Sequence, residues 1–279
     1  MSAQLRASFK KEILAFTRTK KAFILALVFV GIAALYPLLI QGTYSMMAAM
    51  SDMYGEMGID VSGLGDTESG MHTMASFGLQ QALAFIASAG LLIYLILINS
   101  FAGGEQKKRS VIIPRSAGLN CFNYLFPKFI IYPLAALILS IIGALIGGAV
   151  SSYAFTNNDL DFNKVFASGA LLGVYLMLYV CLHLSLGTAT GRAGLSSAAC
   201  IFAALILPDL FYILHSAEYV YNPFALSLLA ATMGQGAEVD ADVVITVVIA
   251  LAIMVAVFFA ALFAQNARKV DNSGDEILI

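Results

Sequence analysis

Long apolar stretches separated by short polar ones dominate the chain. The first of them, 22–40, has 19 residues without a charged side chain. A helix of that length reaches about 28 Å, close to the thickness of the hydrocarbon core of a bilayer. Similar stretches follow at about 82–102, 129–153, 166–186, 195–214 and 243–264. The pattern predicts an all-α polytopic membrane protein with six transmembrane helices, folded as a single transmembrane domain over residues 1–279.

The composition agrees with lipid as the main solvent. Hydrophobic residues make up 60% of the chain and charged residues 11%, whereas a soluble domain has about 25% charged residues. The three cysteines are Cys121, Cys181 and Cys200, and none lies in a predicted outer segment. A disulfide framework is therefore not expected. The net charge of -2 does not indicate nucleic-acid binding, so the bilayer is the expected surrounding and no nucleic-acid partner is predicted.

The positive charges are distributed unevenly between the two sides of the predicted bundle. Residues 1–21 hold six Lys and Arg, 103–128 hold five and 265–279 hold two, and Arg192 lies on the same side. The opposite side has only Lys164. Because Lys and Arg are enriched in cytoplasmic segments, we expect a multi-pass protein of the cytoplasmic membrane with both termini in the cytoplasm.

The N-terminal segment, 1–21, has the pattern of an interfacial helix. Leu5, Phe9, Ile13 and Phe16 recur at steps of four, four and three residues, which places them on one face of a helix. Basic residues on the rest of the surface favour anionic headgroups, although Glu12 falls beside the apolar face. A solvated basic tail is the alternative.

The loop 103–128 combines basic residues with a short apolar run and begins at the cytoplasmic end of the second span. An apolar centre ringed by charges is typical of a protein interface, so we interpret this loop as the contact surface for a cytoplasmic motor. Glu105 is expected to meet a basic group of that motor. The alternative is that the basic residues serve only to orient the chain in the membrane. The candidate contact residues are Glu12, Glu105, Arg109, Ser110, Val111, Ile113, Pro114 and Arg115.

The first outer loop, 42–78, contains seven of the eleven methionines. Met46, Met50, Met53 and Met57 step by four, three and four residues, and His72 follows. Thioethers and imidazole are suitable ligands for Cu(I). The interpretation we prefer is a short amphipathic helix whose pliable Met face packs on the bundle or on lipid, with the metal site as the alternative.

Polar residues within or beside the apolar stretches are candidates for a substrate pathway: His183, Asp209, Asn222 and Pro223. An ionisable group within a membrane is a functional candidate by default, although a neutral His183 can also hydrogen-bond a neighbouring helix. Residues 207–229 stay rather apolar although the topology places much of this segment outside. Short helices that re-enter the outer leaflet are therefore expected.

Several familiar sites are absent from the sequence. There is no GxxxxGK[ST] motif, so a P-loop nucleotide site is not expected in this chain. There is no HExxH motif. The apolar stretches lack paired carboxylates, which argues against a carrier driven by protons or sodium. We expect no enzyme activity and no cofactor in this chain alone.

The layout resembles the type-2 ABC transporter permeases, the membrane subunits of ABC exporters. Three places carry the resemblance: Lys11, Glu12 and Arg18 before the first span; Glu105, Ser110, Pro114, Ser116 and Lys128 after the second; and Pro208, Asn222 and Pro223 before the sixth. Where that family often has Gly-Thr, this chain has Arg109-Ser110. The difference implies a more electrostatic contact with the motor.

The resemblance implies a fold and a set of partners. The fold has an N-terminal elbow helix, a cytoplasmic coupling helix after the second span, and re-entrant outer helices before the sixth. The partners are a dimer of cytoplasmic ABC ATPase subunits, which holds ATP and Mg, and a second permease copy or a homologous permease. The cargo would be a peptide, a lipid-like molecule or a drug. The alternatives are a membrane-embedded regulatory or metal-handling protein and an ATP-independent secondary carrier.

Overall fold

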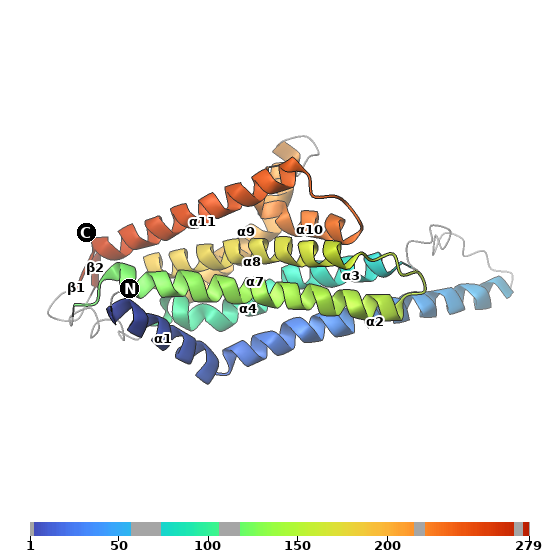
Figure 1. Ribbon diagram of the computed structural model, residues 1–279, viewed down its shortest axis with the longest axis horizontal. Helices are drawn as coiled ribbons and strands as arrows, with labels where there is room; N and C mark the ends of the chain where they lie inside the picture. The colour runs from blue at the N-terminus through green and yellow to red at the C-terminus, as the bar shows by residue number, and fades with distance from the viewer. Residues whose placement is uncertain (1–2, 57–73, 106–117, 215–220, 271–275, 279) are drawn as a thin grey trace.

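The structure is a computed structural model that describes residues 3–56, 74–105, 118–214, 221–270 and 276–278. Over these residues the chain is helical almost throughout (Figure 1). The α-helices are α1 Ala3–Arg18, α2 Lys21–Glu56, α3 Ala75–Phe85, α4 Leu91–Asn99, α7 Cys121–Ala154, α8 Phe162–Thr190, α9 Ala193–Leu214, α10 Leu226–Gly234 and α11 Ala241–Ala267. Short π-helices η3 Ile86–Gly90 and η4 Ser100–Gly104, a 3₁₀ helix η5 Pro223–Ala225 and two paired strands, β1 Arg268–Val270 and β2 Glu276–Leu278, complete the described chain.

Among the described residues, five helical segments are long and apolar enough to cross a membrane: Lys21–Met47, Ala75–Gly104, Cys121–Ala154, Phe162–Thr190 and Ala241–Ala267. The expectation of an all-α membrane protein is therefore confirmed at this level. The sixth expected span falls on α9, but the stretch with described side chains, Ala193–Pro208, is shorter than the other five. Six spans stay a prediction.

The helices extend beyond the apolar stretches that predict them. α2 has 36 residues and continues to Glu56, so part of the expected outer loop 42–78 prolongs the first apolar helix. α7 begins at Cys121, inside the expected loop 103–128. Hydropathy marks only the apolar part of a helix, whereas backbone hydrogen bonding continues into its polar ends.

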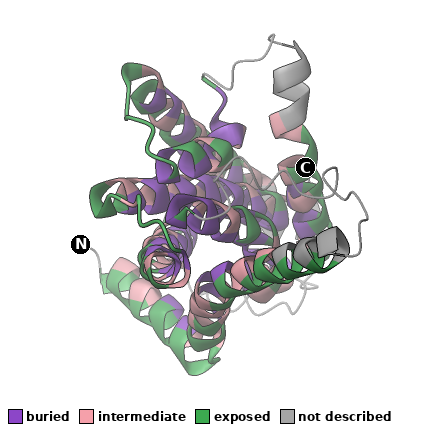
Figure 2. Ribbon diagram, turned by 90° about the vertical axis from the view of Figure 1, so that its right-hand side faces the viewer, coloured by how far each residue is buried: buried purple, intermediate pink, exposed green. Residues whose placement is uncertain are grey.

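α8 lies at the centre of the bundle and packs against α7, α9, α10 and α11. Small residues permit the close approach of α7. A Cβ atom at Gly169 would lie 2.6 Å from the Cβ of Ala144 and 3.1 Å from the Cα of Ile141. Figure 2 shows the buried residues gathered at this centre and the exposed ones on the outward faces. Close packing through small residues is one way in which membrane helices associate.

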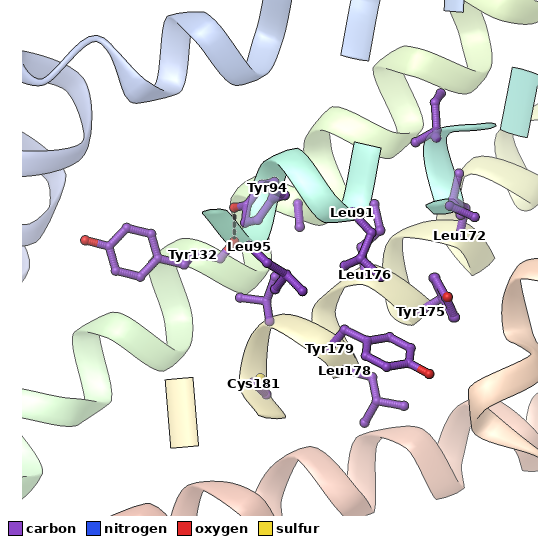
Figure 3. Packing of buried hydrophobic residues seen from close by; sticks show 14 of the residues in the cluster. Leu91, Tyr94, Leu95, Tyr132, Leu172, Tyr175, Leu176, Leu178, Tyr179 and Cys181 are labelled. Carbon is purple, nitrogen blue, oxygen red and sulfur yellow. Dashed lines mark hydrogen bonds between the residues drawn. The ribbon is translucent and has the colours of Figure 1, made fainter. Parts of the chain in front are cut away.

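The buried core joins α4, α7 and α8 (Figure 3). Leu91 and Leu95 of α4 are at most 2% exposed. Tyr94 on the same helix is also buried, and its hydroxyl donates to the carbonyl oxygen of Tyr132 on α7 at 2.6 Å. A polar side chain buried in this way needs such a partner, and the bond fixes α4 against α7.

Helix α3 begins against the connection between α7 and α8. The backbone N–H of Ser76 donates to Asp159 Oδ1 at 2.9 Å, and the Ser76 hydroxyl donates to Asp159 Oδ2. The N–H of Ala75 donates to the carbonyl of Asn157 at 2.9 Å. Since the first N–H groups of a helix have no partner within it, a carboxylate from another segment caps α3.

Asp159→Ala is expected to lower the apparent stability by about 1–2 kcal/mol, the usual cost of losing a helix cap. Thermal unfolding in detergent, followed by circular dichroism, measures the loss. Asn158→Ala is the control, because among the described residues the Asn158 side chain forms a hydrogen bond only with the nearby N–H of Leu160, at 3.4 Å. Equal stability of the two variants would contradict the capping role.

Figure 1 places α1 and the end of α11 with its strand pair at the same end of the long axis. The opposite end holds the C-terminal half of α2 and the beginning of α3. We refer to the first as the α1 end of the bundle. The residues that lead to the segment 106–117 lie at this α1 end.

Candidate functional site

Four charged side chains meet at the α1 end and form the charge cluster: Lys11, Glu12, Glu105 and Lys128. Lys128 Nζ lies 2.8 Å from Glu105 Oε2 and 3.6 Å from Glu12 Oε1. Lys11 Nζ lies 3.0 Å from Glu105 Oε1 and 3.4 Å from Glu12 Oε1. Two positive and two negative charges alternate, so the cluster has no net formal charge.

The charge cluster joins three elements that are distant in sequence. Lys11 and Glu12 belong to α1, Glu105 follows the π-helix η4, and Lys128 lies in the second turn of α7. Glu105 is the last described residue before the segment 106–117. The cluster therefore holds the last described residue of the second span against α1 and α7.

Two tyrosines of α7 complete the hydrogen bonding of the carboxylates. The Tyr124 hydroxyl donates to Glu105 Oε2 at 2.8 Å, and the Tyr132 hydroxyl donates to Glu12 Oε2 at 2.7 Å. Lys128 also donates to the carbonyl oxygen of Phe101 at 3.1 Å. Each carboxylate thus has both ionic and hydrogen-bonding partners.

The burial of these charges is extensive. The side chains of Lys128, Glu12 and Glu105 are 0%, 2% and 17% exposed, whereas Lys11 is 53% exposed. A buried charge is costly unless it is paired and hydrogen-bonded, and the loss of one partner leaves the others uncompensated. The cluster therefore holds α1, η4 and α7 in one arrangement as long as all its members are present.

The pKa of Glu105 reflects this environment. Burial raises it, but the charges of Lys128 and Lys11, with hydrogen bonds from Lys128 and Tyr124, lower it more, and the net pKa is about 2. A carboxyl whose pKa is lower in the folded state stabilises the fold above its unfolded pKa. Glu105 is thus ionised at neutral pH, and its contribution is lost as the pH falls from about 4.5 toward 2.

The stability of Glu105→Gln is expected to depend less on pH in this range. The parent protein should be more stable than this variant at pH 5, and the difference in stability should vanish as the pH falls to 2.5. Protonation of Glu105 in the parent then removes the same negative charge that the substitution removes. Thermal unfolding at each pH measures the difference. Glu238→Gln, which removes an exposed carboxylate, should follow the parent. A difference in thermal stability between the parent and Glu105→Gln that did not change with pH would contradict the lowered pKa of Glu105.

Neighbouring helices hold the π-helix η4 on several sides. Ser197 of α9 donates to Asn99 Oδ1 at 2.6 Å, and Lys21 of α2 donates to the Ser100 hydroxyl. A Cβ at Gly103 would lie 2.6 Å from the carbonyl oxygen of Gly187 on α8. π-helical turns are rare and are frequently found at functional sites. Here one leads directly to Glu105.

Of the eight residues expected to contact the motor, only Glu12 and Glu105 belong to the described part of the chain. Glu12 and Glu105 come together, and both oxygens of Glu105 are held by side chains of its own chain. The expected contacts Arg109, Ser110, Val111, Ile113, Pro114 and Arg115 lie outside the described residues. Tyr124 and Tyr132 were not expected from the sequence, and Lys128 was expected only as a residue of the family resemblance at the opening of the third span. A lysine inside an apolar helix was the signal that could have identified it.

The four residues proposed for a substrate pathway do not form one described site. His183 is buried in α8, and Ser196 Oγ lies 2.7 Å from its Nδ1 while donating to its carbonyl oxygen at 2.6 Å. Asn222 instead accepts from the N–H of Phe224 and caps η5, which begins at Pro223. The side chain of Asp209 lies outside the described residues. His183 thus has a contact with the neighbouring helix α9, as the helix-joining interpretation of this residue expects.

The methionine stripe continues along α2. Met46, Met50 and Met53 are 66%, 42% and 51% exposed, whereas Met57 and His72 lie outside the described residues. Within the described part of the chain, no three His, Cys, Asp or Glu side chains lie where they could hold a metal ion. The choice between a packing face and a copper site stays open.

A pocket of about 580 Å³ lies between the α3–η3–α4 segment on one side and α9, with α8 and α10, on the other. Its lining is mostly apolar, with Gln80, Gln81, Ser88, Tyr175 and Ser227 as the polar members. Among the residues whose side chains are described, none that lines it is charged. Its size and lining suit an uncharged, largely apolar molecule.

Comparisons with protein-family models, with characterised proteins and with solved structures found no significant match.

Proposed function

We propose that this chain is the membrane-spanning permease subunit of an ATP-driven exporter of the type-2 ABC class. The observation that carries the proposal is the charge cluster at the base of the segment 106–117. A motor that moves this segment needs a rigid connection to the spans. Glu105 provides one, because it is bound to Lys128 in α7 and to Lys11 in α1.

In this proposal a separate ATPase dimer contacts residues 106–117 and the neighbouring surface of α1. A displacement of Glu105 pulls on α7 through Lys128 and on α1 through Lys11, so three elements move together. η4 connects the same point to α4, and the pocket lies farther along this span at η3 and α3. The cargo pathway would then include the pocket, and its lining favours an uncharged, lipid-like or drug-like molecule.

The test is a pull-down of the full chain in mild detergent with Val111→Asp and Ile113→Asp together. A motor groove that accepts an apolar run would reject two carboxylates. Since the number of Lys and Arg residues is unchanged, insertion should continue. We expect normal membrane levels, a lost ATPase partner and no export.

The matched control is Val111→Leu with Ile113→Leu, which keeps the run apolar. It should retain both the partner and export. If the double Asp variant still bound an ATPase and exported its cargo, the coupling role of this segment would be excluded. If the unaltered chain bound no ATPase, the exporter proposal itself would fail.

The proposed orientation gives a separate prediction. Reporters inserted near Gly118 or fused to the C-terminus should be cytoplasmic, and reporters near Gly63 or Gln235 should be external, because nearly all Lys and Arg lie on one side. Alkaline phosphatase and fluorescent-protein fusions measure the two locations. An external reporter near Gly118 would overturn the orientation.

A further inference from the structure

The pocket between the α3–η3–α4 segment and α9 opens on the side of the bundle, and we refer to it as the lateral groove. Part of its lining is buried and forms the floor, as at Ala87, Leu91 and Tyr175. Five other lining residues are exposed and form the rims: Ala84, Ser88, Leu92, Leu205 and Leu228. Because the α3–η3–α4 segment is long and apolar enough to cross a membrane, the lateral groove faces lipid along this segment.

The lateral groove is about as long as one leaflet is thick. A helix rises about 16 Å between positions such as Gln81 and Leu92, and half of the hydrocarbon core of a bilayer measures about 15 Å. Gln81 lies about 9 Å from the beginning of the segment at Ala75, near the border between headgroups and hydrocarbon. The groove therefore extends from the headgroup level toward the middle of the bilayer, in the leaflet opposite the α1 end (Figure 1).

The hydroxyl groups along the lateral groove already have partners. The Ser88 hydroxyl donates to the carbonyl oxygens of Ala84 and Phe85, at 3.0 and 3.3 Å. The side chain of Tyr175 is hydrogen-bonded to that of Ser227. Hydroxyls that are satisfied in this way need no hydrogen bond from an occupant. The part of the groove beyond the glutamines can therefore accept a hydrocarbon chain.

The two glutamines at the headgroup end differ from these hydroxyls. Gln80 accepts a hydrogen bond from the amide of Gln235. Among the described residues, the half-buried amide of Gln81 forms no hydrogen bond. Because an amide has two N–H donors and an oxygen acceptor, Gln81 offers both kinds of hydrogen-bonding group at the level where the head of a lipid would lie.

The surroundings of this end favour a head without net charge. None of the lining residues with described side chains is charged. Exposed Glu238 and Asp240 follow Gln235, the partner of Gln80. Like charges repel, so these carboxylates disfavour an anionic head. Hydroxyl groups remain as the chemistry that an amide can bind by both donating and accepting.

We propose that the lateral groove binds one uncharged lipid whose head carries hydroxyl groups, either a diacylglycerol or its glycosylated form. The head lies at Gln81, and an acyl chain lies along the groove toward Leu92. The lipid enters from the side, out of the leaflet opposite the α1 end. The inference deepens the proposed function and rests on it only where the lipid is regarded as cargo. An amide at the headgroup level with an apolar depth favours a lipid over a helix of a second copy.

The chain contains no tryptophan, so a single introduced indole reports on the lateral groove alone. Leu92→Trp places it on one rim and Leu228→Trp on the other. Phe259→Trp, on an exposed position of α11 outside the groove, reports on ordinary contact with lipid. Diacylglycerol or glucosyl diacylglycerol with brominated acyl chains, which quench indole fluorescence on contact, is titrated into neutral-detergent micelles that hold the purified full chain.

Both groove reporters should be quenched saturably and at a lower lipid fraction than Phe259→Trp. Quenching of this kind by either lipid supports the proposal, and the lipid that acts at the lower fraction identifies the head. Gln81→Leu, combined with Leu92→Trp, should raise the lipid fraction at half-maximal quenching about fivefold, the effect of one neutral hydrogen bond. Ala204→Phe, which fills the groove from α9, should remove the saturable quenching.

Thr232→Val is the control for Gln81→Leu, because it removes an exposed hydroxyl of α10 outside the lateral groove. It should leave the half-maximal fraction unchanged, and thermal unfolding should show that every variant is folded. Equal quenching of the groove reporters and Phe259→Trp at each lipid fraction would overturn the proposal. Equally strong quenching by brominated phosphatidylglycerol would do so too.

A second copy in the groove would give a different result. The groove reporters would then stay unquenched while the chain eluted as a dimer, and the groove would be assigned to that copy. Failure of the exporter proposal is separate, because the titration contains no ATPase. Saturable quenching of a chain that binds no ATPase would leave the lipid site in place and exclude only the export function.

Discussion

Lys128→Met is expected to destabilise the folded protein by about 3–5 kcal/mol, the usual cost of removing one partner from a buried ion pair. Methionine has a similar length and fills the same space, so the main change is electrostatic. Within the charge cluster, Lys11 would then be the remaining positive charge for Glu12 and Glu105, and it is 53% exposed. The yield of monodisperse protein in detergent and its thermal unfolding measure the effect.

The double variant Lys128→Met with Glu105→Gln separates charge from packing. It restores the balance of the charge cluster to one positive and one negative charge, so it should recover part of the lost stability. If the double variant were no more stable than Lys128→Met alone, the role of Lys128 would lie in its other contacts, such as the carbonyl of Phe101.

Gly103→Val is expected to prevent normal packing of η4 and to remove most of the correctly folded protein. A Cβ at this position would lie 2.6 Å from the oxygen of Gly187 and 3.2 Å from the backbone nitrogen of Ala193. Both are backbone atoms, so they cannot move aside as a flexible side chain would. Overpacking commonly costs about 1–3 kcal/mol and occasionally more, and the rigid neighbours here place the cost at the upper end.

Gly194→Ala is the matched control for Gly103→Val. It adds a methyl group close to the same turn, but beyond its chain neighbours and its own helix backbone no described residue has an atom within 4 Å of the added Cβ. Its expression and thermal unfolding should match those of the parent. Normal folding of Gly103→Val would mean that η4 and α8 can separate without loss of the bundle.

Much of the fold follows from the sequence because its solvent is lipid. A run of apolar residues must form a helix there, since backbone groups have no water to bind. The ends of the helices are less predictable, as the extension of α2 to Glu56 shows. Polar residues occur in the ends of helices as well as in loops, so composition does not locate the residue at which a helix ends.

The candidate site was only partly predictable for a different reason. Glu12 interrupts an apolar stripe and Lys128 lies at the border of a span, so each was visible as an irregularity. Their pairing depends on how α1 crosses the end of α7, and the two residues are 116 positions apart. A single sequence contains no signal for such a contact. The local pattern even assigned Ile13 to the face that Glu12 occupies.

The two π-helices have a consequence for the phase of the second span. Each π turn holds one residue more than the α-helical pattern needs, and every extra residue rotates the following side chains by about 100°. The helical phase of α4 is therefore shifted relative to that of α3 across η3. Glu105 is shifted again relative to α4 because η4 lies between them. A helical wheel drawn continuously from Ala75 to Glu105 would place residues on the wrong sides. The periodicity of cysteine accessibility measured along this span should accordingly break at 86–90, resume with a shifted phase over 91–99, and break again at 100–104.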